Sequence, residues 1–304
     1  MTEQRSARDI DASVFRAEAG SLYVVATPIG NLRDVGLRAL DILRSTDIIV
    51  AEDTRVSAKL LAHYGIATRA RALHEHNEAA RIPALLAELA AARSVAMVSD
   101  AGTPSISDPG ARFVRAALDA GHRVIPIPGP SAVAAAISAA GLAAGRFAFV
   151  GFLPPKVKER DALLAAFATL PAALVFFEAP HRVASTVAKL ATALDGRRRL
   201  VVARELTKTF ESIVSFALRD APAWFAANAE RLRGEFVLVV DAPERDAARR
   251  GAGEQPDDDA VRVLSVLLAE LPPSRAARVA AALTGAPRDA LYDRALALRV
   301  PPPR

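Results

Sequence analysis

Four short loops hold most of the side chains that could take part in chemistry: TPIGNLRD (27–34), AEDTR (51–55), SDAGTPSISDPG (99–110) and PIPGPSA (126–132). Their glycines let backbone groups approach a ligand closely, and their prolines stiffen the chain around it. No GxxxxGKS or GxxxxGKT motif occurs, and no GxGxxG follows the first strand, which argues against a Walker A site and a dinucleotide fingerprint. Such loops suit a nucleoside, but by themselves they do not distinguish one adenosine cofactor from another.

Each of these loops follows a stretch that is typical of a buried strand. Strands are expected at 21–28, 47–53, 94–100 and 123–129, with helices at 37–43, 78–92, 110–120 and 131–141. Apolar strands that alternate with helices indicate a mostly parallel sheet covered on both faces. Because ligands bind at the carboxyl ends of parallel strands, we expect the four loops to share one ligand site. Taken singly, each loop could instead simply turn the chain.

The second half of the chain predicts a different sheet. Strands are expected at 146–153, 172–179, 199–205, 211–218 and 235–242, and helices near 158–169, 182–194 and 220–231. Because only one helix lies among the last three strands, a mixed sheet with antiparallel pairs is expected. We therefore predict an α/β fold with two α/β domains, residues 21–141 and 146–242, preceded by a disordered tail at 1–20.

The last part of the chain predicts a small helical unit. Residues 243–259 are charged and contain glycine, which is typical of a flexible linker. Residues 260–304 predict a helix, a second helix, a tight TGAP turn and a third helix, as in a helix-turn-helix unit. Residues 272–304 contain six arginines and two aspartates, a net charge of +4 that favours RNA binding. The alternative is a three-helix module for dimerisation or packing.

The amino-acid composition limits the partners, the kinds of site and the cellular location that are expected for this protein. The 304 residues carry a net charge of +5, which is compatible with a nucleic-acid partner. The absence of cysteine excludes disulfides, thiolate catalysis and cysteine metal sites, and it fits a cytoplasmic protein. The first twenty residues mix charges without an apolar core, so no signal peptide is expected, and no run of about 18 apolar residues predicts a membrane span.

Eight motifs in order resemble one family. The four loops above are followed by GFLPPK (151–156), FFEAPHR (176–182), ARELTKTFE (203–211) and RGEFVLVV (233–240). Together they resemble the ribosomal RNA small subunit methyltransferase I family of the tetrapyrrole methylase superfamily, the class III methyltransferases. The resemblance covers about residues 21–242, and the helical unit resembles the extra domain of that family.

The resemblance implies a cofactor, a substrate and a site. It implies that S-adenosyl-L-methionine binds in the cleft between two α/β domains and that its methyl group goes to the ribose 2′-hydroxyl of cytidine 1402 in 16S rRNA of the 30S subunit. It also implies a cytoplasmic homodimer. By motif position, the cofactor-binding residues are Pro28, Gly30, Asp100, Ala101, Gly102, Pro104, Gly129, Pro130 and Ser131.

Methyl transfer from a sulfonium needs alignment and a base rather than a metal, and no metal site is expected. Acidic residues and one histidine in the loops that face the cleft are the base candidates: Glu52, Asp53, Asp108, Glu178, His181 and Glu205. Glu178 leads because it ends an apolar strand, although with Arg182 it could simply brace the next helix.

Basic residues are expected to contact the RNA. Those near the cleft, which could hold flanking phosphates or lower the pKa of the hydroxyl, are Arg55, Arg182, Arg204 and Lys208. Those on the last helix are Arg288, Arg294 and Arg299.

Two other functions remain open from the sequence. A tetrapyrrole methyltransferase would share the fold and cofactor, but it does not require a basic helical unit. The loop DAGTP also departs from the GDP-like form of the porphyrin-type enzymes. A non-catalytic RNA- or nucleotide-binding protein is the second alternative, and retention of bound S-adenosylmethionine would separate it from an enzyme.

Overall fold

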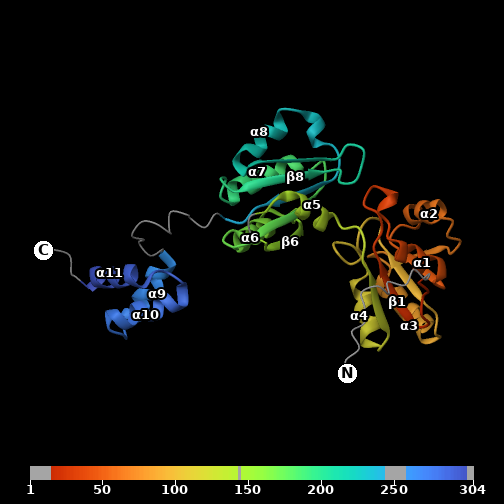
Figure 1. Cartoon of the computed structure of the whole chain (residues 1–304), viewed down its shortest axis with the longest axis horizontal. Coiled ribbons are helices and arrows are strands. Elements are labelled where there is room, and N and C mark those ends of the chain that lie inside the picture. The colour runs from red at the N-terminus through yellow and green to blue at the C-terminus, as the bar shows by residue number, and fades with distance from the viewer. Residues whose placement is uncertain (1–14, 143–144, 244–257, 300–304) are drawn as a thin grey trace, which may run out of the picture. The chain divides into compact units, whose positions relative to one another are not determined.

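The computed structural model describes residues 15–142, 145–243 and 258–299. The chain divides into two compact units, Met1–Pro243 and Glu244–Arg304, and Figure 1 shows the elements of each. None of the described helices has the length and apolar character needed to cross a membrane.

The first sheet is parallel throughout. Its strands are β1 (Ser21–Val25), β2 (Ile48–Ala51), β3 (Ala70–Ala72), β4 (Val95–Val98) and β5 (Arg123–Ile127). They lie in the order β3-β2-β4-β1-β5, and every neighbouring pair is parallel. The helices are α1 (Leu37–Ser45), α2 (Thr54–His63), α3 (Glu78–Ala90), α4 (Ala111–Asp119) and α5 (Ala132–Ala140). The predicted parallel sheet is confirmed.

Two cores explain why these strands read as continuous apolar runs. Successive side chains of a strand point to opposite faces. Tyr23 packs with Ile42 and Leu43 of α1 on one face. Its neighbour Leu22 packs with Leu89 of α3 and Phe113 of α4 on the other. Because helices cover both faces of the sheet, the side chains that point to either face of the strand are apolar.

Helix α2 and strand β3 were not expected from the sequence. Strand β3 has three residues, none fully buried, and pairs only with β2 at the edge of the sheet. Its sequence, Ala-Arg-Ala, has neither an apolar run nor β-branched side chains. Pairing with β2 rather than local propensity therefore places this strand.

The second sheet is mixed, as predicted. Its strands are β6 (Phe147–Phe152), β7 (Ala173–Glu178), β8 (Arg199–Arg204), β9 (Ser212–Ala217) and β10 (Phe236–Val240). The order is β6-β7-β10-β8-β9; β6 and β7 are parallel, and the other three pairs are antiparallel. The main helices are α6 (Val157–Phe167), α7 (Val183–Ala193) and α8 (Ala221–Ala226).

The two faces of the second sheet are covered by different parts of the chain. Val187 of α7 and Phe225 of α8 pack on the face that carries Phe176. Ala136 and Ala140 of α5 belong to the core on the opposite face. Helix α5, which the sequence analysis assigned to residues 21–141, thus packs against the second sheet.

Residues of the predicted tail make defined contacts. The N–H of Phe15 donates to Oδ2 of Asp41 at 3.2 Å, and the N–H of Glu18 donates to the Tyr23 hydroxyl at 2.7 Å. A buried tyrosine hydroxyl needs a hydrogen-bond partner, and the N–H of Glu18 supplies one to the fully buried Tyr23. Residues 1–14 of the predicted tail lie outside the described residues.

The second unit contains three helices among its described residues. They are α9 (Asp258–Leu268), α10 (Pro273–Thr284) and α11 (Arg288–Arg299). Leu264, Ala277 and Leu291 contribute one residue from each helix to a small core. Gly285 ends α10 with a φ of 73°, which favours glycine. This layout confirms the predicted helix-turn-helix-like unit, while residues 244–257 of the predicted linker lie outside the described residues.

Candidate functional site

The loops after β1 and β4 are joined by backbone hydrogen bonds. The N–H of Thr27 donates to the carbonyl of Gly102 at 2.8 Å, and the N–H of Gly102 donates to the carbonyl of Thr27 at 3.0 Å. Gly102 has a φ of 85°, which a side chain would strain. Two of the four predicted loops therefore form one surface at the carboxyl edge of the first sheet.

A first cavity of about 370 Å³ lies between this edge and the second sheet. Ala101, Gly102 and Ser131, all predicted to bind cofactor, line it from the first sheet side. Phe177 and Val237 line it from the second sheet. Apolar walls with a few polar groups are typical of a small-molecule site.

A second cavity of about 310 Å³ adjoins the first. It is lined by Pro28, Gly30 and Asp100, three further predicted cofactor residues, and by Ser57 and Lys59 of α2. Ile29, Ala101, Lys208 and Glu235 line both cavities. The structure thus brings six of the nine predicted cofactor residues to two adjoining spaces.

The other three predicted cofactor residues, Pro104, Gly129 and Pro130, line neither cavity. The carbonyl of Pro130 accepts a hydrogen bond from the Thr103 hydroxyl at 3.3 Å. A Cβ atom on Gly129 would lie 3.0 Å from Cβ of Ala26. These contacts hold the loop after β5 against its neighbours.

Glu178, the leading base candidate, is held by protein groups. Its Oε2 accepts from the Thr186 hydroxyl at 2.6 Å, and its Oε1 accepts from the N–H of Ala179 at 2.9 Å. Arg182 Nε lies 3.3 Å from Oε1, and the glutamate side chain has no exposed surface. Glu178 lines the first cavity. Its contacts favour the bracing role that the sequence left as the alternative.

Glu52 and Asp108 lie in an acidic region. Burial, followed by the charges of Asp100, Asp108 and Asp53, raises the pKa of Glu52. Burial also raises the pKa of Asp108, the charge of Asp100 adds to this, and a hydrogen bond from Ser99 opposes it. Asp108 lines the first cavity, whereas Glu52 lines neither.

The raised pKa of Asp108 predicts a pH-dependent stability. The native protein holds the proton more tightly than the unfolded chain, so stability falls as pH rises from the ordinary value of 3.8 through the raised pKa. Asp108→Asn should therefore raise the melting temperature at neutral pH, and the gain should vanish below about pH 3.5. Thermal melts across pH test this, with Asp119→Asn, an exposed carboxyl at the end of α4, as control. Equal shifts for both variants would contradict it.

Two other base candidates are exposed or paired. His181 is exposed and lines neither cavity. Asp53 caps α2 and binds Arg55 at 2.6 Å. Hydrogen bonds from the side chain and backbone of Arg55 lower the pKa of Asp53 to about 2. The Arg55 side chain is 88% exposed at the start of α2. Asp53 is therefore a carboxylate that holds an arginine at the surface.

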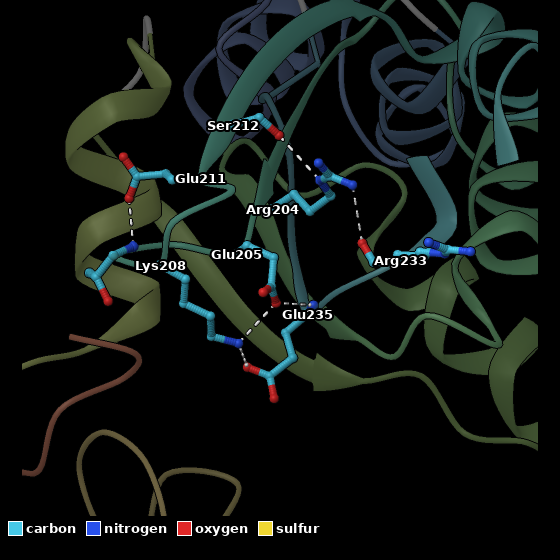
Figure 2. A network of polar contacts seen from close by, with 8 residues as sticks. Arg204, Glu205, Lys208, Glu211, Ser212, Arg233 and Glu235 are labelled. Atoms are coloured by element: carbon cyan, nitrogen blue, oxygen red, sulfur yellow. Dashed lines mark hydrogen bonds and ion pairs between the residues drawn. The ribbon is translucent and has the colours of Figure 1, made fainter. Parts of the chain in front are cut away.

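The loop after β8 carries a polar network (Figure 2). Lys208 Nζ donates to Glu205 Oε1 and to Glu235 Oε2, both at 2.9 Å. The N–H of Glu235 donates to Glu205 Oε1 at 2.8 Å. Burial raises the pKa of Glu205, but the bonds from Lys208 and Glu235 outweigh it, so the pKa lies below its ordinary value. Glu205 is thereby fixed as a carboxylate.

Glu235 was missed by the sequence analysis. It stands in the motif RGEFVLVV, one residue before β10. The only sequence feature that indicated Glu235 was a carboxylate at the start of a buried strand. Ligand-binding loops were expected only at the other end of each strand, the carboxyl end. Because β10 runs antiparallel to β8, its start lies beside the end of β8.

The predicted RNA-contacting arginines fall into two groups. Arg204 donates to the carbonyl of Glu230 at 2.7 Å and to Ser212 Oγ at 3.3 Å, and Arg182 donates to the carbonyl of Leu153. Their guanidinium groups thus hold the protein's own loops. Arg288 and Arg294 are exposed on α11. Arg299 ends the same helix, and its side chain lies outside the described residues.

Among the described residues, no group of three or more His, Asp or Glu side chains is placed to hold a metal ion.

The sequence matches two family models. Residues 21–222 match the Tetrapyrrole (Corrin/Porphyrin) Methylases, and residues 254–299 match the RsmI C-terminal HTH domain. The chain is 47% identical to ribosomal RNA small subunit methyltransferase I of Pseudomonas aeruginosa over 91% of this chain and 97% of that protein. It is 45% identical to the protein of the same name from Escherichia coli O157:H7, over 91% of this chain and 95% of the other.

Solved structures share the fold. The methyltransferase CobJ superposes with a TM-score of 0.56 at 22% identity, covering 74% of this chain and 95% of CobJ. Uroporphyrin-III C-methyl transferase of Thermus thermophilus, solved with S-adenyl homocysteine, superposes with a TM-score of 0.52 at 20% identity. The superposition covers 72% of this chain and 97% of that protein. At these identities the likeness concerns the fold alone.

Proposed function

Because this chain belongs to the ribosomal RNA small subunit methyltransferase I family of the tetrapyrrole methylases, we propose that it methylates the ribose 2′-oxygen of cytidine 1402 in 16S rRNA. The cofactor is S-adenosyl-L-methionine. The observation that carries the proposal is the match to that family over 91% of the chain, together with the matched C-terminal domain at 254–299. A tetrapyrrole methyltransferase, the alternative, is less supported, because the tetrapyrrole methylase model at 21–222 leaves the C-terminal domain at 254–299 unmatched.

The first cavity suits the cofactor. Its walls are mostly apolar, and the backbone of Ala101 and the hydroxyl of Ser131 are available as polar partners. Phe177 offers a flat aromatic face for an adenine ring, and Ile29 adds apolar contact. When bound, S-adenosylmethionine supplies a methyl group on a positively charged sulfur. The residues of the chain then need only to place an oxygen in line with that methyl and exclude water.

The second cavity is suited to the nucleotide. It is lined by the loop after β1 and by α2, at whose start the exposed Arg55 lies, and Lys59 contributes a cation. Exposed cations of this kind bind phosphates of an RNA chain. A deep site cannot read a ribose inside an A-form helix, so the target cytidine must be presented unpaired.

The proposed function is tested by one assay. The purified protein is incubated with labelled S-adenosylmethionine and 30S subunits that lack the modification, and the product nucleoside is identified by mass spectrometry. We expect 2′-O-methylcytidine at position 1402. Methylation at another atom or position, or no transfer to 30S subunits or naked 16S rRNA by protein that still binds cofactor, would contradict the proposal.

We propose that the C-terminal unit contributes to RNA affinity through α11. Replacing both Arg288 and Arg294 by alanine should weaken binding to 30S subunits and lower the slope of log K against log salt by about 1 for each lost phosphate contact. Cofactor affinity should not change. Arg219→Ala, an exposed arginine of the first unit, is the control. An unchanged salt slope in the double variant would refute this role.

A homodimer is also proposed, on the family resemblance. Light scattering of the purified full-length chain measures the molar mass, and a mass of one chain at micromolar concentration would contradict it.

A further inference from the structure

We propose that the carboxylate of Glu235 is the general base that takes the proton from the ribose 2′-hydroxyl, with Lys208 holding that carboxylate in place. The inference rests on the proposed function. Glu235 lines both the cofactor space and the substrate space, and a transferred methyl group must pass from the first to the second.

The boundary between the two cavities contains few groups that can move a proton. Four residues line both spaces, and two of them, Ile29 and Ala101, have apolar side chains. The others are Lys208 and Glu235. Asp108 and Glu178 line only the first cavity, and Asp100 lines only the second. A base must lie within hydrogen-bond reach of the hydroxyl as it meets the methyl group. Glu235 is the carboxylate at that boundary.

Lys208 is a fixed cation at the same place. Partial burial lowers its pKa, but the hydrogen bonds to Glu205 and Glu235 outweigh this, so the pKa of Lys208 lies above its ordinary value. Its side chain also packs against the loop after β1, since a Cβ atom on Gly30 would lie 2.4 Å from Cγ of Lys208. The ammonium group of Lys208 is thus held by Glu205 and Glu235, as Figure 2 shows. Its alkyl chain is held by the loop after β1.

Glu235 retains an oxygen for the substrate. Its backbone N–H is bound to Glu205, and its Oε2 accepts from Lys208, so the residue has a defined place. Its side chain is 76% exposed, and no hydrogen bond to its Oε1 occurs among the described residues. Glu178 differs, because both of its oxygens are occupied by protein donors in a fully buried position.

Two residues with strained backbone lie beside this pair. Glu205 and Thr207 have φ values of 52° and 66°, in the left-handed region that such residues seldom adopt. The Thr207 hydroxyl is buried without a hydrogen-bond partner among the described residues. Strained and unsatisfied groups persist where the surroundings over-determine them, as they do at functional sites.

The proposed step moves one proton to Glu235 and one methyl group to the ribose oxygen. The 2′ O–H bond breaks and its proton passes to the Glu235 carboxylate. The freed electron pair on oxygen forms the new bond to the methyl carbon. The methyl–sulfur bond breaks with its electron pair remaining on sulfur, so the sulfonium becomes a neutral thioether. The remaining N–H of Lys208 is available to the 2′-oxygen, and solvent then removes the proton from Glu235.

Glu235→Gln is the decisive variant, because glutamine keeps the shape and cannot accept the proton. In single-turnover transfer to 30S subunits, we expect the rate to fall by about 10²–10⁴-fold while cofactor affinity stays within about twofold. The wild-type rate should rise with pH and then level off, and the variant should lose that rise. Glu230→Gln is the matched control: it is an exposed glutamate, paired with Arg233 at 2.9 Å, that lines neither cavity.

The outcomes separate this inference from the proposed function. If the wild type forms 2′-O-methylcytidine and Glu235→Gln does so within about threefold of its rate, the base assignment is overturned while the function stands. The base assignment is also overturned if the variant is slow but keeps the wild-type pH profile. If the wild type itself transfers no methyl group to the 30S subunit, the proposed function fails first.

Discussion

Replacing Gly234 by alanine is expected to lower methyl transfer by about 100-fold while leaving the protein folded. Gly234 has a φ of 94°, and a Cβ atom there would lie 2.5 Å from Cγ and 2.9 Å from Oε1 of Glu205. The glutamate side chain can give way, so the collision does not prevent folding. Its carboxylate would then leave Lys208 and the N–H of Glu235, which it now binds at 2.9 and 2.8 Å.

The control for this variant separates collision from backbone strain. Gly121 also has a positive φ of 77°, but a Cβ atom there would meet nothing within 4 Å. Gly121→Ala therefore shares the cost of a left-handed alanine, about 1–2 kcal/mol, without touching the network. Single-turnover rates and melting temperatures of both variants are compared with the wild type. Equal rates in the two variants would show that Glu205 does not position the site.

Removing the carboxylate of Glu178 should have the largest effect on stability. Glu178→Ala is expected to lower the free energy of unfolding by about 3 kcal/mol. The buried carboxylate accepts from Thr186 and Ala179 and pairs with Arg182, so its loss leaves these donors without their acceptor. Urea unfolding measures this by fluorescence of the single tryptophan, Trp224, which packs against the core that contains Phe176.

Two comparisons sharpen the Glu178 experiment. Glu159→Ala removes an exposed glutamate paired with Lys156 at 2.9 Å and should cost under about 1 kcal/mol. Glu178→Gln keeps most of the side chain, and a folded variant should retain transfer within about fivefold of wild type. A collapse of turnover in folded Glu178→Gln, with unchanged cofactor affinity, would restore Glu178 as the base.

Much of the fold follows from local patterns in the sequence. The apolar runs at the centre of 47–53 and 94–100 predicted a sheet covered on both faces, because side chains that point to either face are apolar there. The loops at 27–34 and 99–110 were predicted to meet, because parallel strands end at the same edge, and Thr27 and Gly102 do meet there. Strand β3 escaped prediction because its pairing partner, rather than its own residues, makes it a strand.

The sequence by itself thus determined most of the strands and helices, though not α2 or β3, and it also predicted that four loops lie at one edge and which family the motifs resemble. Only the tertiary structure decided which charged groups meet. Glu205 and Glu235 are thirty residues apart, and they become neighbours because β10 lies antiparallel beside β8, with Arg204 opposite Phe236. No period along the chain encodes that register, since it depends on burying β10 between β7 and β8. Glu178 likewise reads as a reactive carboxylate in sequence; its spacing to Arg182 indicated a possible brace, but its partner Thr186 becomes visible only once α7 packs against β7.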